Sequence, residues 1–280
     1  MSMLSKITPE NPLLLVGCGK MGGAMLQGWL TGGLSLNAVK VIDPLVASVQ
    51  KMLPQLQGDN IVGQVADLPE GLTPGFIILA VKPQMMEQAM TQLEAVDCSG
   101  SVFLSIAAGK TIAYFERHMG QDMAVVRAMP NMPAAIGRGI TVACPNKNVS
   151  EGQKAICHDL LLAAGGVEWV REEKLIDAVT AVSGSGPAYV FSMVEALAGA
   201  GEQVGLPADL ARKLARATIC GSGALLEQSE ETAAQLRMNV TSPNGTTEAA
   251  LNVLMGEKGL GKLMLETVRA AHQRSRDLAD

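Results

Sequence analysis

The sequence predicts an α/β protein in two parts, a parallel sheet covered by helices and then an all-helical region. Short apolar runs rich in β-branched residues alternate with helix-length segments through the first 172 residues. From residue 173 to 280 the helical periodicity continues, and no further strand-like run occurs. With 48% hydrophobic residues, the 280-residue chain can bury the cores of two modest domains. We therefore predict domains of residues 1–172 and 173–280.

The first part contains seven apolar runs of strand length. The runs lack polar alternation, as expected when helices cover both faces of a parallel sheet. Met21–Leu30 has helical spacing, and Ser150 is in position to cap a helix that extends to Ala164. The runs are Leu13–Val16, Val39–Ile42, Phe76–Val81, Val102–Ile106, Met123–Met129, Ile140–Cys144 and, as an edge strand, Val167–Val170.

The second part is predicted to consist of helices joined by short turns. Pro187 and Pro207 are each in position to open a helix, because the first helical turn tolerates a residue without an N–H group. These helices cover Ala188–Val204 and the segment from Pro207 to Leu226, and another follows Leu260. A helical region of this size with broad apolar faces often completes its core with a second subunit. We therefore expect a homodimer.

Composition and charge argue against several classes of function. The net charge is −5 and there is no basic run, whereas a nucleic-acid-binding protein needs a positive face. No apolar stretch approaches the ~20 residues of a membrane helix, and the first residues do not form a signal peptide. The five cysteines and three histidines show no metal-ligand spacing. We expect a cytoplasmic protein with buried free thiols and no metal, nucleic-acid partner or membrane partner.

The segment LLLVGCGKMGGA, residues 13–24, places G-x-G-x-x-G between an apolar run and a helical segment. The first glycine of such a motif allows a tight turn, the second lets a pyrophosphate approach the backbone, and the third allows close helix–strand packing. The helix N-terminus adds free N–H groups and the positive end of its dipole. This pattern predicts a Rossmann-type dinucleotide site, with a plain glycine-rich turn as the alternative. Its candidate contacts are Gly17, Cys18, Gly19, Lys20, Met21 and Gly22.

Asp43 ends the second apolar run, 21 residues after Gly22, where the adenosine ribose of such a site lies. A carboxylate there accepts hydrogen bonds from ribose hydroxyls and repels a 2′-phosphate. The residues Pro44-Leu45-Val46 offer no cation to hold that phosphate. The local chemistry therefore favours NADH over NADPH. The alternative role for Asp43 is to open a turn before Pro44.

Two more loops follow apolar runs, and in an open α/β sheet such loops line the ligand crevice. They are the segments 80–83 and 107–109, whose small residues let the backbone approach a cofactor. Ordinary strand–helix connections are the alternative. The candidate cofactor contacts from these loops are Ala80, Val81, Lys82, Pro83 and Ala108.

Three blocks, RAMPNMP (127–133), VSGSGPAYVF (182–191) and NVTSPNGTTEAAL (239–251), join the glycine motif and AVKP in a pattern that resembles pyrroline-5-carboxylate reductase. The resemblance covers residues 12–278. It implies a Rossmann domain, a helical dimerisation domain and NAD(P)H-dependent reduction of L-1-pyrroline-5-carboxylate to L-proline, the last step of proline biosynthesis. It also implies a homodimer, which in some members assembles into a ring of dimers.

Two positions depart from the family pattern. Asn244 takes the place of the first glycine in its loop, and Met132 takes the place of a threonine. Asparagine tolerates left-handed backbone geometry better than most residues, so we expect the loop around Asn244 to keep its shape.

The segment Ser242–Thr247 has the composition of an anion-binding loop that precedes a helix. Backbone N–H groups at a helix start can hold a carboxylate without an arginine. A protonated cyclic imine needs no strong acid, so positioning and electrostatics would carry most of the rate. From the residues alone, a simple helix cap is the alternative. The resemblance implies that the Thr246 backbone binds the carboxylate and that the Thr247 hydroxyl bonds to the ring nitrogen as the catalytic contact. It also implies that Glu173 lies near the substrate, that Glu230 supports the two threonines and that Asn239 contacts the cofactor.

Two other functions compete with this one. A 3-hydroxyacid dehydrogenase also joins a Rossmann domain to helices, but it needs a base, commonly a lysine, on the long helix after the junction. Residues 186–204 contain neither lysine nor histidine, which argues against that enzyme. The other is a non-catalytic dinucleotide-binding dimer. The retention of Thr246, Thr247 and Glu230 argues against such a scaffold, and oxidation of NAD(P)H by the imine would distinguish the two.

Overall fold

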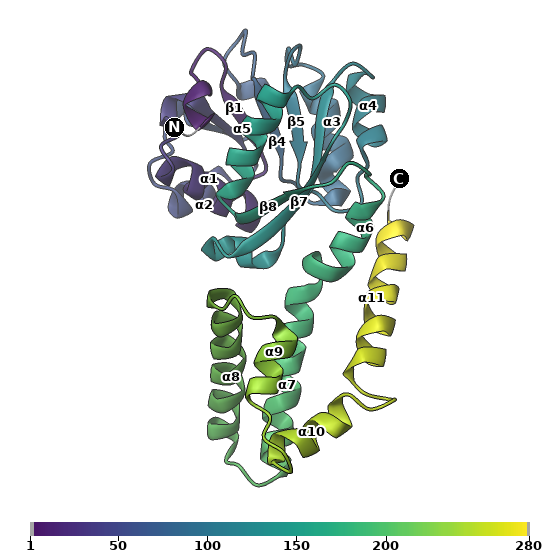
Figure 1. Cartoon of the computed structure of the whole chain (residues 1–280). Coiled ribbons are helices and arrows are strands. Elements are labelled where there is room, and N and C mark those ends of the chain that lie inside the picture. The colour runs from purple at the N-terminus through teal and green to yellow at the C-terminus, as the bar shows by residue number, and fades with distance from the viewer. Residues whose placement is uncertain (1–2, 279–280) are drawn as a thin grey trace. The chain divides into compact units, whose positions relative to one another are not determined.

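The computed structural model describes residues 3–278 (Figure 1). The chain forms two compact units. One contains the residues up to Gly184 together with those from Ala271 onward, and the other is Ser185–Ala270. Residues 173–184 therefore pack with the sheet unit, although the sequence places them in the helical part. As a division of function, the boundary near residue 172 stays a prediction.

One eight-stranded sheet forms the core of the first unit, in the order β3-β2-β1-β4-β5-β6-β7-β8. Its first six strands have the order of a Rossmann fold, as the sequence predicts. All neighbouring strands pair in parallel except β6 and β7. The strands are β1 Leu13–Val16, β2 Val39–Ile42, β3 Ile61–Val62, β4 Phe76–Leu79, β5 Val102–Ser105, β6 Ala124–Met129, β7 Gly139–Pro145 and β8 Gly165–Trp169.

The antiparallel pair β6–β7 departs from the fully parallel sheet that the sequence predicts. Only residues 130–138 connect the two strands, and a parallel crossover needs a dozen residues or more. The chain therefore turns back, and Ala128 pairs with Ala143. Because β8 runs parallel to β7, the carboxyl ends of these two strands point in the opposite direction to the carboxyl ends of β1, β4, β5 and β6.

Helices cover both faces of the sheet and create two core layers. Leu13 and Leu15 of β1 join one buried cluster, whereas Leu14 and Val16 join the other. The first layer includes residues of α1 (Lys20–Thr31) and α5 (Glu151–Leu162), and the second includes residues of α3 (Met86–Leu93) and α4 (Ile112–Met119). Burial on both faces explains why the strand sequences lack polar alternation.

Local signals set the helix ends where the sequence predicts them. The Ser150 hydroxyl accepts a hydrogen bond from the Gln153 N–H, and the Gln153 side-chain oxygen accepts one from the Ser150 N–H, which forms a capping box at the start of α5. Pro187 lies in the first turn of α7 (Gly186–Gln203), and α8 (Ala208–Gln228) begins after Pro207. No helix among residues 3–278 is both long and apolar enough to cross a membrane. The other helices are α2 Val46–Met52, α6 Leu175–Val179, α9 Ala233–Asn239, α10 Thr246–Leu254 and α11 Leu260–Asp277.

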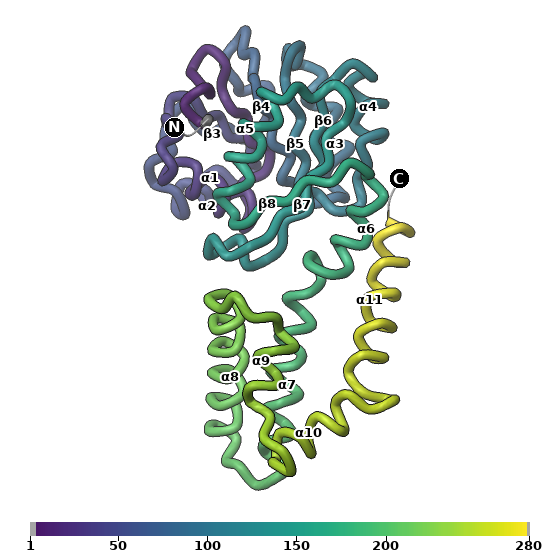
Figure 2. Tube along the Cα trace, in the orientation of Figure 1, coloured from purple at the N-terminus to yellow at the C-terminus, as the bar shows by residue number. Residues whose placement is uncertain are grey.

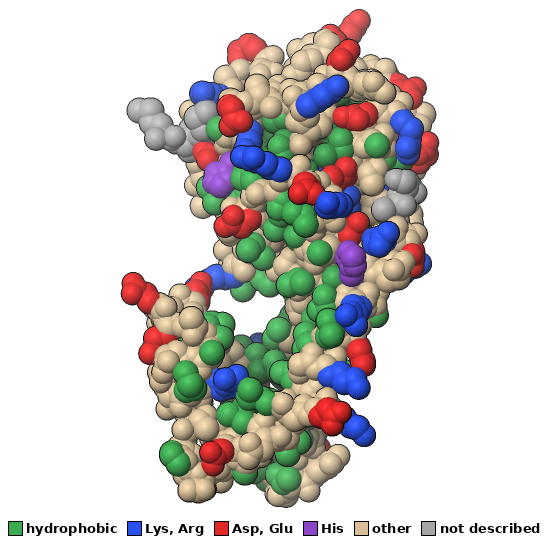
Figure 3. Space-filling model, turned by 45° about the vertical axis from the view of Figure 1, so that its right-hand side comes forward, with side chains coloured by type: hydrophobic (Ala, Val, Ile, Leu, Met, Phe, Trp, Pro, Cys, Tyr) green, Lys and Arg blue, Asp and Glu red, His purple; other side chains and the backbone are tan. Residues whose placement is uncertain are grey.

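The helical unit buries little apolar surface of its own. Its helices α7 and α8 lie side by side (Figure 2). Within the described segment Ser185–Ala270, the buried hydrophobic residues are the small side chains of Ala198, Ala211 and Ala215. Large apolar side chains stay at the surface (Figure 3), and Phe191 is 53% exposed. So small a core favours association with a second surface, in line with the expected dimer.

All five cysteines are free thiols, and four of them are buried as expected. The exception is Cys220 of α8, which is exposed. Burial raises the pKa of the Cys157 thiol to about 12. Burial, with a smaller contribution from the Asp97 carboxylate, raises the pKa of Cys98 to about 11. These two thiols therefore stay protonated at neutral pH, which fits a packing role.

Candidate functional site

A pocket of about 380 Å³ lies at the carboxyl ends of β1, β2 and β4. The strand order reverses between β1 and β4, and α/β sheets bind ligands at such a switch point. Leu45 and the α3 residue Gln88 contribute further parts of its wall. Six predicted cofactor contacts also line this pocket: Gly17, Gly19, Asp43, Ala80, Val81 and Lys82.

Local packing requires glycine at two of the three motif positions, Gly17 and Gly22. Gly17 has a φ of +91°, and a side chain there would press against Val81 and the Ala80 carbonyl. A Cβ at Gly22 would collide with the Gly17 carbonyl, so only glycine lets α1 pack this closely on its loop. Gly19 is the N-cap of α1, and a Cβ there would meet open space. The backbone at Gly19 is therefore accessible to a ligand.

The other predicted cofactor contacts do not line this pocket. Cys18 is buried, and burial, together with the Asp43 carboxylate, raises the pKa of its thiol to about 12. Asn239 belongs to the helical unit. The remaining residues of this group are Lys20, Met21 and Gly22 in α1, Pro83 at the start of a 3-10 turn, and Ala108 after β5.

The Asp43 carboxylate is held by two backbone N–H groups. The Cys18 N–H donates to Asp43 Oδ2 at 2.7 Å, and the Leu45 N–H donates to Oδ1 at 2.8 Å. The bond to Leu45 is the turn contact that the sequence offers as an alternative role, and the bond to Cys18 ties β2 to the glycine loop. Asp43 also lines the pocket, and each carboxylate oxygen keeps further capacity to accept hydrogen bonds.

The predicted substrate loop lies at the start of α10. Asn244 has a φ of +58°, the left-handed geometry expected at a position where the family pattern has glycine. Its N–H donates to the Glu248 carboxylate at 2.7 Å, and the Gly245 N–H donates to the Ser242 carbonyl at 3.1 Å. Thr246 and Thr247 form the first turn of α10, where N–H groups have no acceptor earlier in the helix. These groups are suited to an anion.

Asn239 and Glu230 lie in local surroundings of the helical unit. The Asn239 amide donates to the Glu231 carboxylate at 3.0 Å and accepts from Gln235 at 2.8 Å. Glu230 is exposed after α8 and makes no hydrogen bond or ion pair within residues 3–278. The carboxylate that bonds to Asn239 is thus that of Glu231, one position after Glu230. The sequence carries no signal that distinguishes these two glutamates. Glu248 was also missed, although an acid in the first turn of a helix is a common capping signal.

Glu173 lies in a polar network of the sheet unit. Arg127, whose side chain is 3% exposed, donates from Nη1 to Glu173 Oε1 at 2.9 Å and has Nη2 3.6 Å from Asp177. The Ile112 N–H donates to the same Glu173 oxygen at 2.8 Å, so Glu173 also caps α4. Ser275 of α11 donates to Asp177 at 2.9 Å. The network ties β6, α4, α6 and α11 together, and the predicted substrate contact of Glu173 stays a prediction.

Comparison with known proteins identifies the family. Residues 173–278 match the family described as pyrroline-5-carboxylate reductase dimerisation, and residues 13–109 match NADP oxidoreductase, coenzyme F420-dependent. A pyrroline-5-carboxylate reductase of Pseudomonas aeruginosa is 35% identical over 268 residues, which are 96% of this chain and 97% of the relative. The chain belongs to the pyrroline-5-carboxylate reductase family. A pyrroline-5-carboxylate reductase of Mycobacterium tuberculosis is 38% identical over 290 aligned positions, which cover 95% of this chain and 96% of the relative.

Solved structures of pyrroline-5-carboxylate reductases share the whole fold. The structure from Coxiella burnetii is 30% identical, with a TM-score of 0.87 over 97% of this chain and 99% of that chain. The Plasmodium falciparum reductase, solved with NADP bound, is 27% identical with a TM-score of 0.78 over 96% and 98% of the two chains. The expected family, the Rossmann-type sheet and the helical dimerisation region are thereby confirmed.

Proposed function

We propose that this protein reduces L-1-pyrroline-5-carboxylate to L-proline with a nicotinamide coenzyme, as the last step of proline biosynthesis. The observation that carries the proposal is the match to reductases over nearly the whole chain. Two local features support it. The sheet unit has a glycine-lined pocket at its switch point, and the helical unit has a threonine-bearing helix start suited to a carboxylate.

The residues of the pocket fit a dinucleotide. The open space beside Gly19 and the N-terminus of α1 suit a pyrophosphate, since backbone N–H groups and the helix dipole favour negative charge there. A bound NAD(P)H supplies the hydride. Asp43 would accept hydrogen bonds from ribose hydroxyls with the capacity that its two backbone bonds leave.

For the substrate, we assign the start of α10 to the carboxylate and the ring nitrogen. The N–H groups of Thr246 and Thr247 would bind the carboxylate, and the Thr247 hydroxyl would bond to the nitrogen as the imine becomes an amine. Fixed dipoles of this kind lower the barrier because they need no reorganisation during the reaction. Glu173, Glu230 and Asn239 keep the roles that the family resemblance implies, as predictions.

We further propose that NADH is preferred over NADPH. Asp43 lines the pocket, and the β2–α2 connection brings no cation beside it. A 2′-phosphate would then lie near the Asp43 carboxylate, with no cation from that connection to hold it. The ratio of kcat/KM for the two coenzymes tests this, and a higher value with NADPH would contradict it. Leu45, a neighbouring lining residue that is 68% exposed, offers the matching gain of function: Leu45→Arg should raise kcat/KM for NADPH about tenfold.

The activity is tested by following NADH and NADPH oxidation with pyrroline-5-carboxylate as substrate. Thr247→Ala should lower kcat about 100-fold or more while coenzyme binding is kept, because it removes a hydrogen bond made to the reacting nitrogen. Thr31→Ala is the matched control, because that hydroxyl bonds to the Gln27 carbonyl near the end of α1. Coenzyme binding by wild type without any oxidation would favour the non-catalytic scaffold.

We propose that the protein acts as a cytoplasmic homodimer. The exposed apolar side chains of the helical unit and its match to a dimerisation family support the dimer. Five free cysteines support a reducing compartment. Light scattering at several protein concentrations would measure the assembly. A monomer at micromolar concentration would contradict the dimer, and a larger particle would fit the ring of dimers implied by the family.

A further inference from the structure

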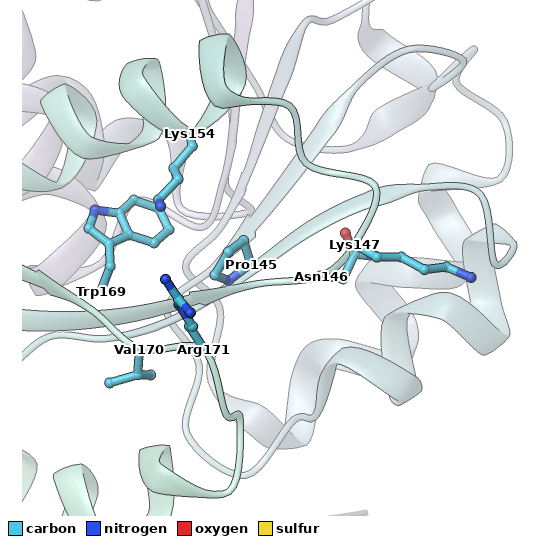
Figure 4. Close-up of a pocket in the computed structure, with 7 residues that line it drawn as sticks. All are labelled: Pro145, Asn146, Lys147, Lys154, Trp169, Val170 and Arg171. Carbon is cyan, nitrogen blue, oxygen red and sulfur yellow. The ribbon is translucent and has the colours of Figure 1, made fainter.

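A second pocket, of about 370 Å³, lies at the ends of β7 and β8 beside α5 (Figure 4). Three of its lining residues are the cations Lys147, Lys154 and Arg171, and no acidic residue lines it. The chain as a whole carries a net charge of −5. A pocket whose charged side chains are all positive, in a chain of negative net charge, is suited to an anion.

This pocket is separate from the coenzyme pocket. The coenzyme pocket lies at the carboxyl ends of β1 and β4. Because β6 and β7 are antiparallel, the carboxyl ends of β7 and β8 lie at the other ends of the strands of the sheet. The two pockets share no lining residue. A ligand in the second pocket would therefore not compete for the glycine loop.

The positive charges of this pocket have no acidic partner within the described chain. Among residues 3–278, no carboxylate lies within 4.0 Å of the side-chain nitrogens of Lys147, Lys154 or Arg171. The neighbouring acid Glu172 pairs instead with Lys174 at 2.6 Å. Cations that line one pocket without a carboxylate partner are available to bind an anionic ligand.

An aromatic side chain forms part of the same wall. Lys154 Nζ lies 5.2 Å from the centre of the Trp169 ring, a cation–π distance. The Trp169 indole N–H donates to His158 Nδ1 at 3.2 Å, which fixes the orientation of the ring. In Figure 4, Lys154 and Arg171 extend near Trp169, whereas Lys147 extends away from it. Lys154, Arg171 and Trp169 therefore lie together on one side of the pocket, away from the end of the Lys147 side chain (Figure 4).

We propose that this pocket binds a phosphate-bearing anion, with the phosphate held by Lys154 and Arg171 and the attached group against Trp169. A guanidinium binds phosphate oxygens in pairs, and a lysine adds a point charge. A phosphate monoester carries a charge of about −1.5 to −2 at pH 7, which matches two cations, whereas a carboxylate carries only one. An organic phosphate and free inorganic phosphate share this chemistry.

The proposal is tested by titrating the full-length protein with phenyl phosphate and with inorganic phosphate by calorimetry. Saturating NAD⁺ is present throughout, so that the coenzyme pocket is occupied. We expect phenyl phosphate to bind, and Lys154→Gln and Arg171→Gln each to weaken its binding about tenfold. Lys147→Gln removes the same charge from a side chain that extends away from Trp169 (Figure 4) and should change the affinity less than about twofold.

The two ligands distinguish the possible sources of the anion. Tighter binding of phenyl phosphate, lost in Trp169→Ala, assigns the site to an organic phosphate. Equal binding of both ligands, with the same dependence on Lys154 and Arg171, assigns it to free phosphate. The proposal is overturned if neither ligand binds wild type, or if all three glutamine variants weaken binding equally, since the latter would reflect only the general charge of the surface.

Discussion

Arg127 offers the sharpest test of how the sheet unit is held together. Its side chain is 3% exposed and bonds to Glu173, with Asp177 within ion-pair distance. Replacing Arg127 with methionine keeps much of the apolar stem and removes the charge. Glu173 and Asp177 then lose their cation while they stay 27% and 15% exposed.

The magnitude follows from two opposing contributions. Removing one partner of a buried ion pair costs about 3–5 kcal/mol, because it leaves an uncompensated charge. The two carboxylates retain some access to water, and Arg127 Nε is buried without a hydrogen-bond partner in residues 3–278, so its loss removes a penalty. We therefore expect Arg127→Met to lower the free energy of unfolding by about 2–3 kcal/mol.

The measurement is urea unfolding followed by tryptophan fluorescence, since Trp29 and Trp169 both lie in the sheet unit. Lys174→Met is the matched control in the same unit, because Lys174 is 78% exposed and its partner Glu172 is 60% exposed. An exposed pair of this kind contributes little to stability. If the two variants lose equal stability with unchanged m-values, the buried network does not hold the sheet unit as we argue.

Three further predictions concern individual residues. Burial lowers the pKa of His118, but its hydrogen bonds to the Tyr114 carbonyl and the Glu87 carboxylate outweigh burial and raise the pKa overall. The protonated imidazole therefore contributes stability that is fully present below the unfolded pKa of about 6.5 and is lost as pH rises through the raised folded pKa. The urea midpoint of wild type should exceed that of His118→Gln at low pH, and the two midpoints should converge as pH rises over that range. Gly22→Ala should weaken NADH binding about tenfold or more in a fluorescence titration, since the methyl group would displace the glycine loop, and unchanged affinity would contradict this. Asn244→Val should lower the free energy of unfolding by about 1–2 kcal/mol and raise the KM for the imine, whereas Asn244→Gly should leave both nearly unchanged; equal behaviour of the two would mean that the left-handed geometry is not required.

The parts of the fold that the sequence predicted are those encoded by neighbouring residues. The run Leu13–Val16, the glycine turn and the start of α1 follow one another directly, so their geometry is set within a few residues. Ser150 and Gln153 form their capping box across three positions. Pro187 and Pro207 mark helix starts for a purely local reason, the missing N–H group.

The parts that the sequence did not predict depend on contacts between segments that are not adjacent in the sequence, or on the length of the connection between them. β3 comprises only Ile61–Val62, too short for any periodicity, and is held by pairing with β2. The direction of β7 depends on the length of its connection to β6 rather than on its own residues. Arg127 and Glu173 are 46 positions apart, and nothing in either local sequence identifies the other as its partner.

Asp43 shows why two roles that a sequence presents as alternatives need not exclude each other. Ribose binding and turn formation each need a carboxylate oxygen, so the residue type cannot separate them. In the structure, two backbone N–H groups occupy part of the acceptor capacity, and the same side chain lines the pocket. The charge that would repel a 2′-phosphate is therefore one that the glycine loop itself requires. Removing Asp43 would loosen the loop as well as relax selectivity, and a change of coenzyme preference has to come from a neighbour such as Leu45, whose side chain carries no such bond.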